Sequence, residues 1–149
     1  MGLENSNSAS RRGDQALFIP LARESISAGF PSPAEDYIEL DIDLNRHLLK
    51  NPTSSFFLRV SGNSMNNAGI YNNDLLIIDR SINPKSGDVV VAILDGEFTL
   101  KRLVKENKNY YLKADKEDYP IIDLCEYNEV IIWGVAIYSI HSLYGINIF

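Results

Sequence analysis

From about residue 55 onward, short apolar runs alternate with turn residues, a pattern that is typical of β-strands. The predicted strands are rich in β-branched and aromatic side chains and span residues 56–60, 74–79, 88–94, 97–104, 110–114 and 130–140. The third run is continuous enough in apolar residues to be buried on both faces. Asp95 and Gly96 follow it and form a favoured two-residue hairpin turn, since both positions need positive φ. The pattern predicts a mainly β fold, a single compact antiparallel β-sheet domain with little helix.

The N-terminal third has a different pattern. Residues 1–16 are polar, which predicts a mobile arm, and residues 17–21 form a short apolar patch that could dock on a surface. Residues 25–33 are small and interrupted by prolines, which disfavour helix at themselves and at the preceding residue. We therefore expect an extended backbone there. Residues 36–50 carry apolar side chains at near-helical spacing, which predicts one short helix.

Size, charge and cysteine content narrow the possible functions. The 149 residues suffice for one domain with a real core. A net charge of -6 argues against a general nucleic-acid binder, whose surface is basic. No apolar run approaches the ~20 residues needed to span a bilayer, and no secretory signal is evident. The single cysteine, Cys125, excludes an internal disulfide and fits a reducing cytoplasm. We expect a cytoplasmic protein.

Ser64 and Lys101 carry the candidate chemistry. Ser64 follows a break in a strand-like run at Gly62, and Lys101 lies on the return strand of the predicted hairpin, on the face of Thr99. A serine hydroxyl is a poor nucleophile until a base removes its proton, and a desolvated lysine can act as that base. If the two side chains meet, the chain is a serine–lysine peptidase. The alternative is a turn serine that bonds local backbone and a solvated strand lysine.

Other reactive side chains give weaker signals. His47 and His141 belong to no metal-ligand spacing, so we expect neither a metal site nor a cofactor. The acidic neighbours of Cys125 should raise the pKa of its thiol, which argues against a nucleophilic cysteine. The turn after Ser64 could supply free backbone N–H groups to an oxyanion hole.

Several blocks, in order, resemble the LexA/UmuD family of self-cleaving serine peptidases. They are VSGNSM at residues 60–65, GIYNNDLLIID at 69–79, GDVVVA at 87–92 and DGEFTLK at 95–101. GFPSPAEDY at residues 29–37 resembles the UmuD branch in particular. The resemblance implies a compact, curved antiparallel sheet of the LexA/signal-peptidase type with an extended N-terminal arm.

The same resemblance implies roles for individual residues. Ser64 matches the nucleophile, Lys101 the general base, and the backbone N–H groups of Ser64 and Met65 the oxyanion hole. The bond between Ala28 and Gly29 matches the self-cleaved bond. The chain would therefore consist of an arm, residues 1–28, that self-cleavage removes, and a peptidase domain, residues 29–149.

The resemblance also implies partners. It predicts a homodimer, with strand residues such as Ile132, Val135 and Ile137 helping to form or support the contact. It predicts a RecA filament on single-stranded DNA as activator of cleavage, and a UmuC-like translesion polymerase subunit as the partner of the processed form. No direct sequence-specific DNA binding and no membrane contact are expected. The function would be SOS-response mutagenesis.

Three alternatives stay open. The chain could be a fragment of a LexA-type or phage repressor whose DNA-binding domain is missing, because 28 residues cannot hold a helix-turn-helix module. A membrane-anchored signal peptidase shares the chemistry but needs a membrane segment. A binding module that had lost the chemistry would not need both Ser64 and Lys101.

Overall fold

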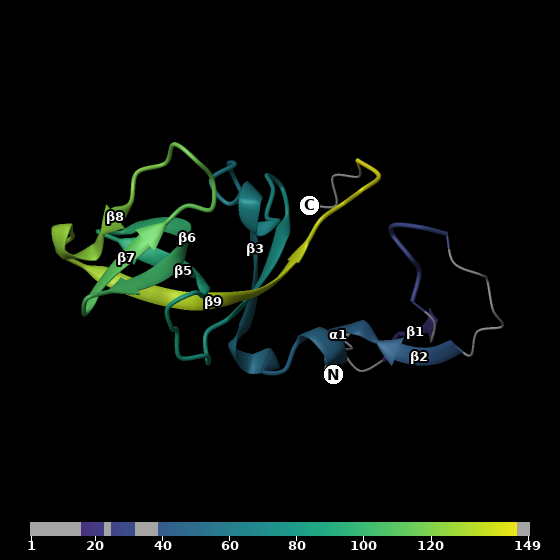
Figure 1. Ribbon diagram of the computed structural model, residues 1–149. Coiled ribbons are helices and arrows are strands. Elements are labelled where there is room, and N and C mark those ends of the chain that lie inside the picture. Colours follow the sequence, from purple (N-terminus) through teal and green to yellow (C-terminus); the bar gives the residue numbers. More distant parts are fainter. Residues whose placement is uncertain (1–15, 23–24, 32–38, 146–149) are drawn as a thin grey trace, which may run out of the picture. The chain divides into compact units, whose positions relative to one another are not determined.

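The computed structural model describes residues 16–22, 25–31 and 39–145 (Figure 1). Almost all of the predicted polar arm, residues 1–16, lies outside these ranges, and so do residues 32–38. The chain divides into two compact units, Met1–Lys50 and Asn51–Phe149. Each unit is described by itself. The predicted division at the Ala28–Gly29 bond concerns processing and stays a prediction.

The second unit is built around one seven-stranded sheet in which every neighbouring pair of strands is antiparallel. The strands are β3 (Ser55–Arg59), β4 (Leu75–Asp79), β5 (Val89–Leu94), β6 (Glu97–Glu106), β7 (Asn109–Lys113), β8 (Ile122–Asp123) and β9 (Val130–Ile140), in the spatial order β3-β4-β9-β5-β6-β7-β8. A short 3₁₀ turn, η1 (Pro52–Ser54), precedes β3, and two more lie between strands, η2 (Asn66–Ala68) before β4 and η3 (Leu124–Glu126) before β9. The predicted mainly β fold is confirmed, and each predicted strand of this unit is present within two residues at either end. The two-residue strand β8 was not predicted.

The turn between β5 and β6 has the predicted conformation. Asp95 has φ 46° and Gly96 has φ 88°, the left-handed values that a two-residue hairpin needs. The hairpin register pairs Leu94 with Glu97 and continues to Val90 opposite Lys101. A short turn with fixed register determines which face of β6 each side chain occupies.

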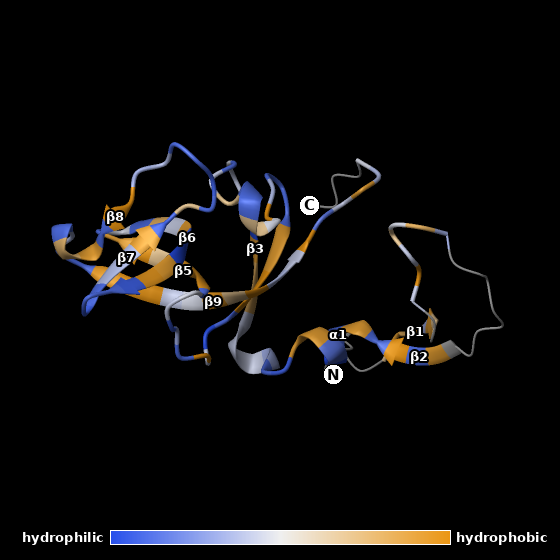
Figure 2. Ribbon diagram, in the orientation of Figure 1, coloured by the Kyte–Doolittle hydropathy of each residue, from blue (hydrophilic) through white to orange (hydrophobic). Residues whose placement is uncertain are grey.

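Hydrophobic side chains on the sheet divide between two core clusters, and Figure 2 shows such residues concentrated along β5 and β9. The first cluster comprises Val60, Met65, Ile70, Leu76, Ile78 and Val91. The second comprises Val90, Ala92, Leu94, Leu103, Leu112 and Val135. Neighbouring residues of β5 therefore point into different clusters, which confirms that this strand is buried on both faces.

The β9 residues expected at a dimer contact are used inside the unit. Val135 belongs to the second cluster, and Ile132 and Ile137 pack against that cluster while remaining partly exposed. Val135 is only 6 % exposed, so it can pack beneath the residues of a dimer contact but cannot itself touch a second subunit. The homodimer itself stays a prediction.

A buried carboxylate links the end of β4 to the segment that precedes the edge strand β3. Asp79, at the end of β4, accepts hydrogen bonds from Asn51 Nδ2 at 2.9 Å, Ser54 Oγ at 3.2 Å and the Ser81 hydroxyl at 2.6 Å. Burial alone raises the pKa of Asp79, but these hydrogen bonds outweigh burial and hold the pKa below its usual value. The charged form is thus fully satisfied, and it joins the segment before β3 to the end of β4.

The first unit contains β1 (Phe18–Ala22), β2 (Glu39–Asp43) and α1 (Leu44–Leu48), with β1 and β2 paired antiparallel. The predicted helix over residues 36–50 is therefore wrong over 39–43; residues 36–38 lie outside the described residues, and of the rest only Leu44–Leu48 are helical. The sequence Glu-Leu-Asp-Ile-Asp alternates polar and apolar positions, and Leu40 and Ile42 lie opposite apolar residues of β1. The helix begins only after Asp43, whose carboxylate accepts from the Arg46 N–H as an N-cap.

The described part of the predicted extended segment, residues 25–31, forms no strand and bends at residues 28–30. Prolines exclude a helix there, but they do not require a straight backbone. The apolar patch at residues 17–21 supplies most of β1 and is exposed, and its docking on a surface stays a prediction.

Gly134 should be intolerant of any side chain. It lies where β9 crosses between β4 and β5, and the pairing of β9 with β5 shifts register beside it, between Val91 and Ala92. A Cβ atom at this position would lie 2.5 Å from Cγ2 of Ile78, a fully buried β-branched side chain that cannot move aside. We expect Gly134→Ala to lower the free energy of unfolding by about 1–3 kcal/mol through overpacking. Urea denaturation would measure this, and an unchanged midpoint would contradict the packing at this crossing.

Candidate active site

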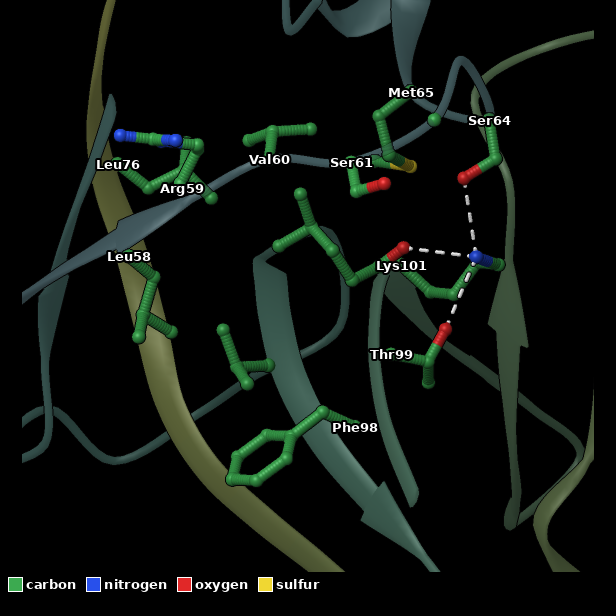
Figure 3. A pocket seen from close by; sticks show the side chains of 13 residues that line it. Leu58, Arg59, Val60, Ser61, Ser64, Met65, Leu76, Phe98, Thr99 and Lys101 are labelled. Carbon is green, nitrogen blue, oxygen red and sulfur yellow. Dashed lines mark hydrogen bonds between the residues drawn. The ribbon is translucent and has the colours of Figure 1, made fainter. Parts of the chain in front are cut away.

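Ser64 and Lys101, 37 positions apart in the sequence, meet in the structure. Lys101 lies in β6, and Ser64 lies in the turn between β3 and η2. The Lys101 Nζ atom is 3.1 Å from the Ser64 Oγ atom, within hydrogen-bond distance (Figure 3). The structure therefore brings together the two residues that the sequence analysis selected for catalysis.

Two further acceptors surround the lysine nitrogen. Lys101 Nζ donates to Thr99 Oγ1 at 3.1 Å and to the backbone oxygen of Leu100 at 3.0 Å. A neutral amine has two N–H donors and one lone pair. If the threonine hydroxyl and the carbonyl accept the two N–H groups, the lone pair is left for the proton of the Ser64 hydroxyl. In the same geometry, neutral Lys101 Nζ can therefore accept a hydrogen bond from the Ser64 hydroxyl.

The surroundings of Lys101 disfavour its charged form. The dyad borders a cavity of about 400 Å³ whose lining includes the apolar side chains of Leu58, Val91, Phe98 and Leu100 (Figure 3). Lys101 is half-buried, and burial lowers the pKa of its amine below the usual lysine value. A lysine with a lowered pKa is deprotonated more often near neutral pH, which a general base requires.

The turn that carries Ser64 is fixed from both sides. Gly62 has φ 97°, a left-handed value that glycine adopts without strain, and its N–H donates to Asn72 Oδ1 at 2.8 Å. Met65 is only 2 % exposed and belongs to the first core cluster. Ser64 thus lies between a glycine that reverses the chain and a methionine anchored in the core.

The N–H groups proposed for the oxyanion hole are free within the part of the chain that the structure describes. Neither the Ser64 N–H nor the Met65 N–H donates a hydrogen bond there. Free N–H groups beside a nucleophile are what an oxyanion hole requires. Their role as an oxyanion hole stays a prediction.

A second buried carboxylate, that of Asp74, stabilises the end of the loop between Val60 and Asp74 that contains Ser64. Asp74 accepts hydrogen bonds from the Tyr71 N–H at 2.8 Å, from Ser139 Oγ at 2.9 Å and through His141 Nδ1 at 2.6 Å. Burial alone raises the pKa of Asp74, but these hydrogen bonds and the nearby His141 hold it below its usual value. The Asp74 backbone also accepts from the Val60 N–H at 2.9 Å, so the loop ends where it began.

The remaining candidates belong to other segments of the chain. Ala28 and Gly29 are exposed in the first unit, in the connection between β1 and β2. Cys125 is exposed in η3, and the nearby Asp123 carboxylate raises the pKa of its thiol, which confirms the predicted direction. Among the described residues, no group of three or more His, Cys, Asp or Glu is placed to hold a metal ion. No helix within the same residues is long and apolar enough to cross a membrane.

Comparison with known proteins identifies the family of this fold and site. The family model for Peptidase S24-like proteins matches residues 20–137. The chain belongs to the Peptidase S24-like family. This match spans both Ser64 and Lys101, and the resemblance to the LexA/UmuD peptidases is confirmed.

The most informative relatives of this S24-like chain are UmuD homologues. Protein ImpA of Salmonella typhimurium is 42 % identical over 134 residues, covering 87 % of this chain and 88 % of ImpA. Protein MucA of Escherichia coli is 39 % identical over 123 residues, covering 82 % of this chain and 84 % of MucA. The LexA repressor of Shewanella denitrificans is 39 % identical over 103 residues, 69 % of this chain but only 49 % of the repressor.

Sequence reasoning missed part of this S24-like site. Thr99 was placed on the face of Lys101 but given no role, although strand alternation brings residues i and i+2 together. The Leu100 carbonyl carried no signal, because every residue has one. The Asp74–His141 contact joins residues 67 positions apart, and no local pattern predicts it.

Lys101 should lose its proton at a lower pH than an ordinary lysine, whose pKa is ~10.4. Burial disfavours the ammonium form, and the three neighbouring acceptors carry no full charge to restore it. NMR of ¹³C-labelled lysine in the Ser64→Ala protein would follow this titration without self-cleavage. The same protein unfolded in urea is the reference. A Lys101 midpoint at or above the unfolded value would contradict the desolvated site.

Proposed function

We propose that this S24-like protein is a UmuD-like factor of SOS mutagenesis that cuts its own Ala28–Gly29 bond. One observation supports the proposal most directly, the 3.1 Å contact between Lys101 Nζ and Ser64 Oγ in an apolar cavity. Membership in a peptidase family makes proteolysis the reaction that this pair serves best.

The first half of the reaction forms an acyl-enzyme. Neutral Lys101 accepts the proton of the Ser64 hydroxyl while Ser64 Oγ attacks the carbonyl carbon of Ala28. The N–H groups of Ser64 and Met65 hold the negative oxygen of the tetrahedral intermediate. When the intermediate collapses, the C–N bond breaks and the Lys101 ammonium returns its proton to the departing amine of Gly29. Residues 1–28 are then esterified to Ser64.

The second half repeats the chemistry with water. Lys101 is neutral again and takes a proton from a water molecule, whose oxygen attacks the ester carbon of Ala28. Collapse breaks the ester, returns the proton to Ser64 Oγ and leaves a carboxylic acid on Ala28, which then releases its proton to solvent. No cofactor or metal takes part in either step.

The proposed bond occupies a suitable segment of the chain. Ala28 and Gly29 are small and exposed, and they lie outside any strand. The bond is in the connection between β1 and β2, so a cut ends the covalent link between these strands and leaves β1 held to β2 by strand pairing. A two-stranded pair of five residues is marginally stable alone, so the cut favours release of the arm.

Loss of residues 1–28 would change the protein by uncovering surface and not by changing its net charge. Residues 1–28 carry three positive side chains (Arg11, Arg12, Arg23) and three negative ones (Glu4, Asp14, Glu24), so the net charge stays at -6 after the cut. The long-range field is therefore unchanged. We propose that the shortened form, as a homodimer in the cytoplasm, joins a UmuC-like error-prone translesion polymerase, and that a RecA filament stimulates the cut.

The repressor alternative is less well supported. The LexA repressor is matched over about half of its length, whereas ImpA and MucA are matched over more than four fifths of theirs. A coding sequence for a DNA-binding domain continuous with this chain would revive the repressor reading. A translesion polymerase gene directly beside it would support the mutagenesis role.

Self-cleavage should accelerate as pH rises through the lowered pKa of Lys101 and then reach a plateau, because only the neutral amine accepts a proton. Ser64→Ala should abolish cleavage at every pH. Lys101→Ala should leave only the residual effects of positioning and the oxyanion hole. Lys101→Arg keeps the charge but cannot give up its proton at these pH values, so it should also be inactive. Cleavage from about pH 7 to 10 measures all three, and an active Lys101→Arg protein would remove Lys101 as general base.

The cut itself should produce a fragment that begins Gly29-Phe30-Pro31. A small side chain is needed next to the attacked carbonyl, and Ala28 provides it. Mass spectrometry of the incubated protein would identify both fragments, and the Ser64→Ala protein under the same conditions controls for contaminating proteases. A main cut at any other bond would refute the assignment of Ala28 and Gly29.

A further inference from the structure

The loop after β7 contacts the turn that carries Ser64. The backbone oxygen of Asp115 accepts a hydrogen bond from the Asn67 N–H at 2.8 Å, and the Asp115 N–H points at Met65 Sδ at 3.4 Å. Both contacts are made by Asp115 backbone atoms, and both reach residues within three positions of Ser64. Asp115 is therefore a direct support of the nucleophile's turn.

The side chain of Asp115 reaches in the other direction, to the strand of Lys101. Its carboxylate accepts from Arg102 Nε at 2.8 and 3.0 Å and from Arg102 Nη2. Arg102 follows Lys101 directly in β6, and its other terminal nitrogen, Nη1, donates to the Gly87 carbonyl. The Asp115 side chain is only 17 % exposed and that of Arg102 32 %, so both are held in place. The hydrogen bond with Asp115 raises the pKa of Arg102 further above its already high value.

Lys101 and Ser64 are therefore connected in two ways. The first connection is the direct contact between their side chains. The second runs from Lys101 along the backbone to Arg102, across the ion pair to Asp115, and through the Asp115 backbone to the turn of Ser64. The ion pair is thus the side-chain link of the second connection, between strand β6 and the turn that carries Ser64.

We propose that Arg102 and Asp115 are positioning residues that set the distance between the Ser64 hydroxyl and the Lys101 amine. The inference rests on the proposed function, since it assigns a role in the reaction of that dyad. Arginine suits the task because its planar fork fixes a carboxylate in both distance and angle. Proton transfer and attack are sensitive to geometry, and a displacement of about 1 Å can cost on the order of 10²-fold in rate.

The test compares plateau rates of self-cleavage at high pH, where Lys101 is neutral in every variant. Asp115→Ala keeps the backbone contacts to Met65 and Asn67 but loses the tie to β6, and Arg102→Met loses the same tie from the other side. We expect each to lower the plateau at least about tenfold. The plateau rate of the double variant should be no lower than those of the single variants, because both substitutions break the same link.

Lys113→Met is the matched control, since Lys113 lies opposite Arg102 on β7 and is exposed. Its plateau should equal that of the unchanged protein.

Two further readouts separate positioning from other roles. A purely electrostatic role predicts opposite shifts of the pH midpoint, upward when the Arg102 cation is removed and downward when the Asp115 anion is removed, with unchanged plateaus. A purely structural role predicts a lower melting temperature but a normal plateau at a temperature where circular dichroism shows each variant folded. Either result would overturn the inference. If the unchanged protein itself fails to cut, the proposed function is wrong, whereas normal plateaus in both variants beside an active parent refute only the positioning role.

Discussion

The removal of water from one lysine amine is the constraint on which this site depends. Lys101 Nζ has three oxygen neighbours, and none of them carries a full charge. An ammonium group there gains no ion pair to offset its lost hydration, whereas a neutral amine can satisfy every donor and its lone pair. The apolar lining of the cavity and the half-buried position of β6 act together, because each keeps solvent from the amine.

Lys101 and Ser64 are each held in place by a structural element that the rest of the sheet fixes. The short turn at Asp95 and Gly96 fixes the register of β6, so Lys101 and Thr99 must share a face. Ser64 is held through the next residue, since Met65 is buried in the first core cluster. Full burial of a methionine stabilises by roughly 1.5–3 kcal/mol, which the turn would lose if it moved away. The site is thus positioned by the same contacts that hold the sheet together.

The sequence alone predicts the strands and the hairpin well, because period-two alternation and an Asp-Gly turn are local signals. It fails at residues 39–43, where Leu40 fits a helical spacing with Leu44 as well as a strand alternation with Ile42. Only the partner strand β1 decides between them. The contact between Ser64 and Lys101 was inferred from chemistry and a family resemblance, not from spacing. The link between Arg102 and Asp115 left no local signal, because an ion pair between a strand and a loop looks like two ordinary surface charges in the sequence.

A dyad that is already assembled within one unit restricts how its reaction can be controlled. Lys101 Nζ and Ser64 Oγ lie within hydrogen-bond distance, and the hydrogen bonds described around them come from residues of the second unit. In the proposed reaction, the fraction of Lys101 that is neutral sets the highest rate available at a given pH. Whether that rate is reached depends on presenting a bond to Ser64, and that bond belongs to a separate unit in the proposed reaction. Bringing a tethered substrate into line can contribute more to rate than a further change in protonation. In the proposed reaction an activator therefore needs no effect on the dyad itself, and regulation can act entirely on delivery of the Ala28–Gly29 segment.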